Sequence, residues 1–392
     1  MQGEALIYFD HNATTPVRPE VAAAMQPALA DLYGNPSSLH REGQRARAAI
    51  ERAREQVAAL VHARPDEVVF TSGGTEGDHL AILGAAWARR GGPGRIAVSA
   101  VEHHAVHGAA EVLTDQGWAV DHLPVGAGGF VDPGAFAPAP GTVLVSLMLA
   151  NNETGVLQPV AELARRAHEA TILVHCDAVQ GAGKVAIDVE ALGVDYLVVS
   201  AHKMGGPKGA GALIARRGAP LSPLFRGTGH ERGRRGGTEN LAGIVGLGAA
   251  AECAARDLAA ESARLVALRT RLEAGIRALR SDAVIHGAQA PRLPNTVNVS
   301  FPGARSDHLL MALDARGVAV SAGAACASGA VEPSPVLSAM AVPRALAISA
   351  VRLSMGRTTT EAEVDEVLRV LGEAVPAAIR VSEAQARAGA PA

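Results

Sequence analysis

The stretch DYLVVSAHKMGGPKG, residues 195–209, decides the fold of this 392-residue chain. Residues 195–200 are almost continuously apolar and rich in β-branched side chains, which is typical of a strand covered on both faces. Lys203 and several glycines follow this strand directly. The stretch therefore predicts a buried strand with an amine held just beyond its carboxyl end.

Similar short apolar runs occur on both sides of this stretch, at 67–71, 95–100, 142–149, 171–176 and 211–215. Helix-like segments lie between several of them, at 75–90, 104–116 and 160–170. Alternating strands and helices predict an open α/β sheet, mostly parallel, which binds ligands beyond the carboxyl ends of its strands.

The pattern changes near Asn240. Residues 240–280 are rich in Ala, Leu and Arg, and this segment is too long for one ordinary helix, so two helices are predicted. Strand-like runs at 295–300 and 350–354 and helices near 307–315 and 361–375 follow. The sequence thus predicts a large domain over 15–255 and a smaller α+β domain formed by 1–14 with 256–392.

Composition excludes several classes of protein. The chain has 36 basic and 39 acidic residues and only 11 aromatic ones, which argues against a nucleic-acid-binding surface. Three widely spaced cysteines do not form a disulfide framework. Without a signal-peptide pattern or 18 uninterrupted apolar residues, we expect a cytoplasmic protein that does not enter a membrane.

Polar clusters follow several of the predicted strands. The turn of residues 70–76 contains glycines and Thr75, which suit a phosphate site at a helix start, although Thr75 could equally be a structural N-cap. His103 and His107 are spaced for one helix face, but no third metal ligand is evident, so His103 stacking on a flat ligand is the better interpretation. Asn151 and Asn152 need partners within their loop or in a ligand.

Two further clusters contain charged groups. Asp177 ends an apolar strand, where a carboxylate is costly unless a cation meets it; a helix N-cap or an ion pair would also explain it. Lys203 is one of only three lysines among 36 basic residues, which favours a Schiff-base role. An anion site at Thr75 and Ser200, the Lys203 amine, the Asp177 carboxylate and the His103 ring together predict pyridoxal phosphate as the cofactor.

At this point the sequence closely resembles the cysteine desulfurases, a branch of the class V aminotransferase group with the type I pyridoxal-phosphate transferase fold. The resemblance runs from Tyr8 to about Arg380. It is carried by the motifs DHNATTP (10–16), TSGGTE (71–76), NNETG (151–155), SAHK (200–203), GHER (229–232), GT (237–238), ACAS (325–328) and VRLS (351–354). Segments 35–40, 175–180 and 233–240 look closest to the nitrogen-fixation type, which is used in iron–sulfur assembly.

The resemblance implies roles for individual residues. Lys203 would bond to the cofactor and later move the Cα proton, with His103 as a catalytic residue stacked on the ring. Cofactor contacts are implied for Gly74, Thr75, Asn152, Asp177, Gln180, Ser200, His202 and, across a homodimer interface, Thr238. Substrate contacts are implied for Asn12, Asn152 and Arg352, the last as a bidentate clamp on a carboxylate.

Cys326 lies in a segment of small residues, 321–330, without a regular period, which predicts a loop that carries a reactive thiol. The family often has a hydroxyl two residues earlier, where this chain has Ala324. Cys176 and Cys253 lie in apolar or Ala-rich segments, which favours simple packing. We expect no resident metal, apart from a transient iron–sulfur contact at Cys326.

The sequence therefore predicts a homodimeric enzyme that converts L-cysteine to L-alanine and passes sulfur, as a persulfide on Cys326, to an iron–sulfur scaffold or another acceptor. A selenocysteine lyase or an aminotransferase of the same fold is the nearest alternative. A non-catalytic sulfur carrier is a third, against which the joint presence of Lys203, Asp177 and Arg352 argues.

Overall fold

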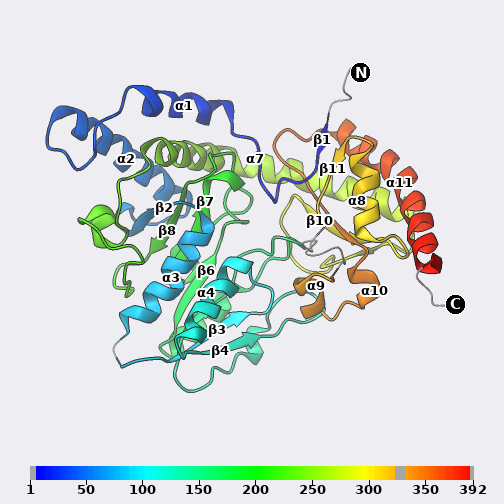
Figure 1. Cartoon of the computed structure of the whole chain (residues 1–392), viewed down its shortest axis with the longest axis horizontal. Helices are drawn as coiled ribbons and strands as arrows, with labels where there is room; N and C mark the ends of the chain where they lie inside the picture. Colours follow the sequence, from blue (N-terminus) through cyan, green and yellow to red (C-terminus); the bar gives the residue numbers. More distant parts are fainter. Residues whose placement is uncertain (1–5, 90, 323–331, 389–392) are drawn as a thin grey trace.

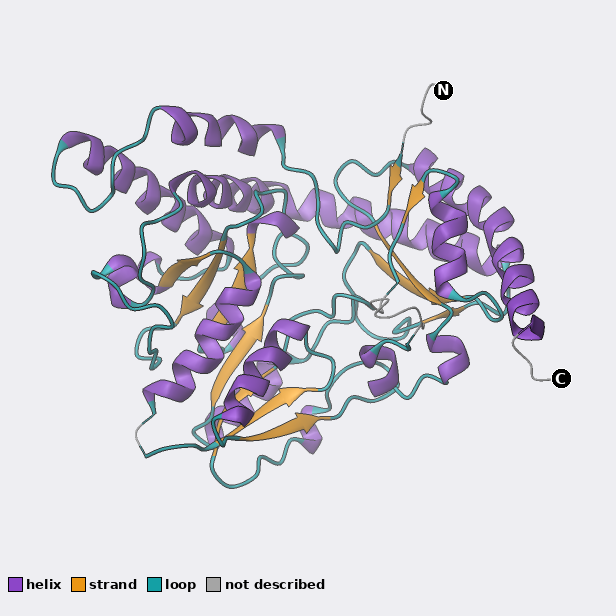
Figure 2. Ribbon diagram, in the orientation of Figure 1, coloured by secondary structure: helices purple, strands orange, loops and turns teal. Residues whose placement is uncertain are grey.

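A computed structural model describes residues 6–89, 91–322 and 332–388 of the chain. Two regions lie side by side and are joined by the long helix α7 (Leu241–Leu279), as Figure 1 shows. The first region contains a seven-stranded sheet, and the second contains two small sheets with helices packed against them (Figure 2).

The seven-stranded sheet confirms the mostly parallel arrangement. Its strands are β2 (Val68–Thr71), β3 (Arg95–Ser99), β4 (Ala119–Leu123), β5 (Thr142–Ser146), β6 (Leu173–Asp177), β7 (Tyr196–Ser200) and β8 (Gly211–Ala215). The order is β2-β8-β7-β6-β5-β3-β4, and only β8 runs antiparallel to its neighbours. The ten residues between β7 and β8 (201–210) are too few for a crossover helix, so β8 returns antiparallel.

Strand β4 was not predicted from the sequence. It is the edge strand, it is mostly half-buried, and it contains Asp121 and His122, so it lacks the continuous apolar run of the central strands.

Alternate strand residues pack into two cores on opposite faces of this sheet. The helices of this region are α1 (Pro19–Ala30), α2 (Arg41–Leu60), α3 (Gly74–Ala88), α4 (His104–Asp115), α5 (Val160–Glu169) and α6 (Val189–Leu192). Phe70, Leu197 and Val199 belong to the core covered by α2, α5 and the first half of α7. Val69 and Val198 belong to the core covered by α3 and α4.

The prediction of two helices over 240–280 is wrong, because α7 is one continuous helix. Residues 249–274 contain no Gly or Pro to break it. Its first half, including Leu247, packs into the core of the large sheet, and its second half, including Leu268 and Leu272, packs into the core of the other region. Each half of α7 therefore packs against its own apolar core, and the single helix connects the two regions.

The second region begins with the N-terminal segment. Strand β1 (Ile7–Tyr8) pairs in parallel with β11 (Val318–Ala319), and β10 (Thr296–Ser300) pairs antiparallel with β9 (Val284–Ile285) and β12 (Ala350–Ser354). Its helices are α8 (Ser306–Asp314), α9 (Pro335–Ala339), α10 (Arg344–Ala347) and α11 (Glu361–Ala388). The predicted final helix thus extends well beyond residue 375.

Phe9 packs with residues of β10, β12 and α11 in the core of this second region. This packing supports our proposal that residues 1–14 join 256–392 in a small domain, beside a large domain over 15–255.

Candidate functional site

A cavity of about 250 Å³ opens beyond the carboxyl ends of β6 and β7. Its lining contains nine of the predicted site residues: Gly74, Thr75, His103, Asn152, Asp177, Gln180, Ser200, His202 and Lys203. Asp78, Met148 and Val179 also line it and were not singled out from the sequence. Asp78 lies one helical turn after Gly74 on α3, and this four-residue spacing was the available signal.

One end of the cavity is suited to an anion. Helix α3 begins at Gly74, its N-cap is Gly73, and no side chain caps it, so Thr75 lies inside the first turn and the N-cap interpretation of Thr75 is wrong. A Cβ on Gly74 would meet Val179 Cγ2 at 2.9 Å, so this position is restricted to glycine by close packing. Ser200 Oγ is buried and has no hydrogen-bond partner within the described part of the chain. A phosphate at this helix start would accept hydrogen bonds both from the uncapped N–H groups of α3 and from the Ser200 hydroxyl.

Asp177 also lines this cavity, and it is the last residue of strand β6. Its Oδ1 accepts a hydrogen bond from the backbone N–H of Val179 at 2.9 Å, and within the described ranges the carboxylate forms no ion pair. Burial raises the pKa of Asp177, and the charges of His103 and Lys203 oppose this rise. A cationic ligand group beside Asp177 would supply the counter-charge that the protein does not.

Two other buried carboxyl groups surround Asp177. Burial, followed by the charge of Asp177, raises the pKa of both Asp78 and Glu102, the latter to about 8. Asp78 Oδ1 has no hydrogen-bond partner in the described structure and lies 3.3 Å from Nε2 of the buried His175. This side of the cavity can therefore balance a positive charge.

The Lys203 amine reaches the N-terminal segment. Its Nζ donates to the backbone carbonyls of Asn12 at 2.5 Å and Ala13 at 2.8 Å. Burial and then the charge of Arg352 lower the pKa of Lys203 to about 8, although Asp177 and Asp10 oppose the shift. An amine with such a pKa is neutral often enough near pH 8 to attack a carbonyl carbon.

His103 and His202 are neutral rings at the cavity. His103 is the N-cap residue of α4, and its Nδ1 accepts from the N–H of Ala105 at 3.1 Å, so its ring orientation is fixed. Loss of surrounding solvent lowers the pKa of His103, and lowers that of His202 to about 4. His202 Nδ1 lies 3.2 Å from Thr14 Oγ1.

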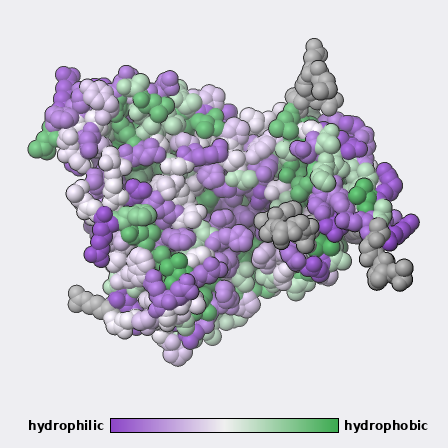
Figure 3. Space-filling model, viewed as in Figure 1, coloured by the Kyte–Doolittle hydropathy of each residue, from purple (hydrophilic) through white to green (hydrophobic). Residues whose placement is uncertain are grey.

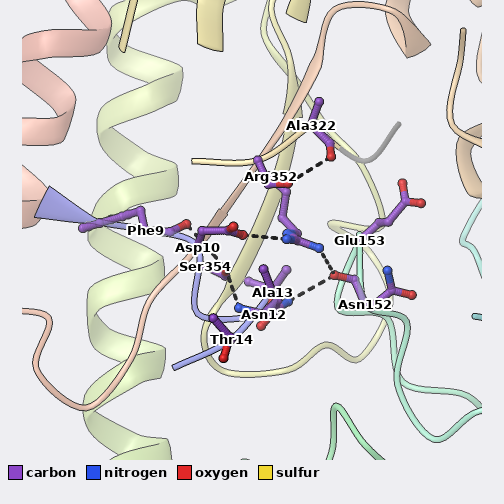
Figure 4. Close-up of polar contacts among 12 residues, drawn as sticks. Phe9, Asp10, Asn12, Ala13, Thr14, Asn152, Glu153, Ala322, Arg352 and Ser354 are labelled. Atoms are coloured by element: carbon purple, nitrogen blue, oxygen red, sulfur yellow. Dashed lines mark hydrogen bonds and ion pairs between the residues drawn. The ribbon is translucent and has the colours of Figure 1, made fainter. Parts of the chain in front are cut away.

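Arg352 lies beside the cavity, in the network of Figure 4. Its Nη2 forms an ion pair with Asp10 Oδ1 at 2.6 Å, and its Nη1 donates to the carbonyl of Asn152 at 3.0 Å. Arg352 Nε is buried without a partner in the described structure. The guanidinium is thus held in place with donor capacity remaining for a carboxylate.

Asn12 lies in the same network with its side chain turned into the protein. Its Nδ2 donates to Thr296 Oγ1 at 2.9 Å and to the carbonyl of Asn152 at 3.2 Å, and its Oδ1 accepts from Asn295. The Oδ1 of Asn151 accepts from the N–H groups of Glu153 and Thr154 in its own loop, and its Nδ2 donates to the carbonyl of Val101 at 3.0 Å. Of this pair of asparagines, only Asn152 lines the cavity.

Thr238 does not line this cavity. It is exposed and lies in a separate hollow with Ser72, Gly209 and Arg235. Cys326 falls in residues 323–331, which lie outside the described residues. Cys176 and Cys253 are free and buried.

Within residues 6–89, 91–322 and 332–388, no group of three or more His, Cys, Asp or Glu side chains could hold a metal ion. None of the described helices is both long and apolar enough to cross a membrane.

A mostly parallel sheet with a lysine and a carboxylate at neighbouring strand ends defines the type I pyridoxal-phosphate transferase fold, as predicted. The family model for "Aminotransferase class-V" matches residues 7–367, and the chain belongs to this family. A relative from Dictyoglomus turgidum, "Cysteine desulfurase IscS", is 44% identical over 367 residues, 93% of each protein. A "Cysteine desulfurase" from Cereibacter sphaeroides is 48% identical over 371 residues, 93% of this chain and 94% of the relative.

Solved structures confirm the fold class. A "NIFS-LIKE PROTEIN" superposes with a TM-score of 0.87 at 38% identity and covers 94% of this chain and 98% of its own. A structure described as "SspA in complex with cysteine" gives a TM-score of 0.79 at 35% identity, with 89% of this chain and 98% of that one covered.

Proposed function

We propose that this enzyme is a cysteine desulfurase that depends on pyridoxal phosphate and converts L-cysteine to L-alanine. One observation carries the proposal: a single cavity contains the Lys203 amine, the Asp177 carboxylate and an unpartnered Ser200 hydroxyl at an uncapped helix start. The relatives named cysteine desulfurase and the class-V family support it.

The cavity residues fit pyridoxal phosphate by their chemistry. Thr75, Ser200, His202 and the N–H groups that begin α3 would hold the phosphate, and Asp177 would hold the ring nitrogen in its protonated form. The neutral His103 ring would stack on one face of the ring. When bound, the cofactor withdraws electrons from the Cα of an attached amino acid. Lys203 provides the amine that binds the cofactor and can move the Cα proton.

Arg352 is the proposed clamp for the substrate carboxylate. The Asp10 ion pair and the Asn152 carbonyl fix the guanidinium, and its buried Nε still lacks a partner within the described residues. Asn152 lines the cavity next to this clamp, so it can contact both cofactor and substrate.

Cys326 is the proposed sulfur acceptor. The C–S bond of cysteine breaks, a bond forms between this sulfur and Sγ of Cys326, and alanine leaves, so thiol plus cysteine gives persulfide plus alanine. An iron–sulfur scaffold or another acceptor then takes the sulfur, in the cytoplasm. The names of the IscS relatives favour this sulfur-supply role.

The experiment follows alanine and the mass of the Cys326 peptide after incubation with L-cysteine without reductant. We expect alanine, and one or more added sulfur atoms on that peptide. Cys326→Ala should abolish alanine formation and sulfur addition, while the visible absorbance of bound cofactor remains. Cys253→Ala is the matched control and should retain alanine formation and sulfur addition. Full alanine production by Cys326→Ala would reject the mechanism, and preferential turnover of selenocysteine in that variant would favour a selenocysteine lyase.

We also propose a homodimer, in which Thr238 contacts the phosphate site of the partner; Thr238 is exposed and lies outside the cavity of its own chain, which leaves it accessible for this role. Sedimentation should give a dimer, and Thr238→Ala should weaken cofactor retention. A monomer with full cofactor and activity would contradict this.

A further inference from the structure

Lys184 is a buried lysine with no part in the proposed chemistry. It lies on the turns that follow β6, with 8% of its surface exposed. Its Nζ donates to two oxygens of Gln180, the backbone carbonyl at 3.0 Å and the side-chain Oε1 at 3.2 Å. A buried ammonium without a carboxylate partner is costly, so its position calls for an explanation.

The first consequence concerns the Gln180 amide. An ammonium group only donates hydrogen bonds, so the amide atom that faces Lys184 is the oxygen. The amide NH₂ must then point the other way, and Nε2 donates to the carbonyl of Asn12 at 3.0 Å. The same carbonyl accepts from Lys203 Nζ at 2.5 Å. Lys184 therefore determines which end of Gln180 acts as the donor.

The second consequence follows from where each residue lies. Gln180 lines the cofactor cavity and Lys184 does not. Lys184 lines a separate cavity of about 290 Å³, between the N-terminal segment, α7 and residues 355–358. Lys184 is thus behind Gln180 as seen from the cofactor, and its hydrogen bonds reach the cofactor only through the amide. Of the two amide protons, one goes to Asn12 and one is left for the cavity.

We propose that Lys184 is a positioning residue that holds the Gln180 amide as a donor toward the cofactor cavity and places a positive charge behind it. The ligand atom that this arrangement favours is an anionic oxygen, which on the proposed function is the ring hydroxyl of the cofactor in its ionised form. The inference rests on the proposed function for the identity of that oxygen.

The charges around Lys184 are consistent with this role. Burial, then the charges of Lys203 and Arg352, lower the pKa of Lys184 to about 7. Loss of the positive charge on Lys203 would remove one of these causes, so the pKa of Lys184 would then rise. Besides Lys203 and Arg352, the titratable side chains that face Lys184 are those of His11 and Glu261, which line the same cavity. Arg18 and Arg357 also line this cavity.

The test is a pH titration of the visible absorbance of the holoenzyme, without substrate. Lys184→Met removes the charge and both donated hydrogen bonds, so the midpoint of the absorbance change should move up by about one pH unit. Lys184→Gln keeps a donor without a charge and should move it by less. If the Met variant does not fold, the Gln variant decides.

A double-mutant cycle separates positioning from general destabilisation. In a Gln180→Met background, Lys184→Met should move the midpoint by clearly less than it does alone, because only the effect of its charge remains. An unchanged midpoint in Lys184→Met, or additive shifts in the double variant, would overturn the inference. A protein that shows no visible absorbance with added pyridoxal phosphate would instead contradict the proposed function.

Discussion

The two sides of the active site are built in different ways. The cofactor side consists of short segments that follow strands of one sheet, so Gly74, Asp177 and Ser200 lie close together because parallel strands end at a common edge. The substrate side depends on contacts between distant parts of the chain, since Arg352 pairs with Asp10, 342 residues away. Local sequence determines the first side, and contacts between distant parts of the chain determine the second.

The surface of the molecule mixes apolar and polar residues. In the view of Figure 3, apolar residues occur as small groups among polar ones. Leu39 and Tyr33, near the start of α2, are among the most exposed large apolar side chains of the described residues, with exposed fractions of 91% and 81%.

The largest expected effect is on the cofactor side, from Lys203→Ala. Loss of the amine should reduce alanine formation by about 10³-fold or more, because a covalent step and a proton carrier are lost together. Lys203→Arg is the matched control. Its guanidinium keeps a positive charge and can donate hydrogen bonds to the Asn12 and Ala13 carbonyls, but it cannot form the covalent bond to the cofactor. Both variants should lack the visible absorbance of the wild type, and activity in either would show that another amine acts.

Arg352→Met comes next, and its main effect should be on the substrate side. Removing one partner of a buried carboxylate contact costs about 2–5 kcal/mol, so kcat/KM for L-cysteine should fall by roughly 30-fold to 5,000-fold. The absorbance of the resting holoenzyme should remain, because the residue does not line the cofactor cavity. Steady-state kinetics with unchanged kcat/KM would show that another group binds the carboxylate.

A smaller effect is expected from Asp10→Ala. The Arg352 guanidinium would lose the 2.6 Å contact that orients it, and KM for L-cysteine should rise about tenfold with little change in kcat. Asp10→Asn keeps an oxygen acceptor at the same position and should retain most of the affinity. Equal defects in both variants would mean that the charge of Asp10, and not its geometry, is what matters.

The arrangement of the cofactor side follows from the sequence more directly than that of the substrate side. Nine of the ten predicted cofactor residues follow an apolar run that is visible in the sequence, and the structure brings these nine into one cavity. The Asp10 partner of Arg352 and the inward-facing amide of Asn12 were not predicted, because no local spacing connects residues so far apart. The continuous α7 was missed for the same reason, since its second half is stabilised by a core formed from distant segments.

The two sides are also coupled by charge, and the smallest predicted effect tests this coupling. Burial is the main reason that the pKa of Lys203 is lowered to about 8, and the positive charge of Arg352 is the next. Arg352→Met removes that charge, so the pKa of Lys203 should rise by a few tenths of a unit to about one unit. The neutral amine is then available only at higher pH.

The rate at which the cofactor-free protein takes up pyridoxal phosphate should therefore reach half its maximum at a higher pH in the variant. Arg369→Met, on the exposed face of α11, is the matched control and should leave this midpoint unchanged. A midpoint that is the same in all three proteins would mean that Lys203 does not sense Arg352, and that the two sides of the site are electrostatically independent.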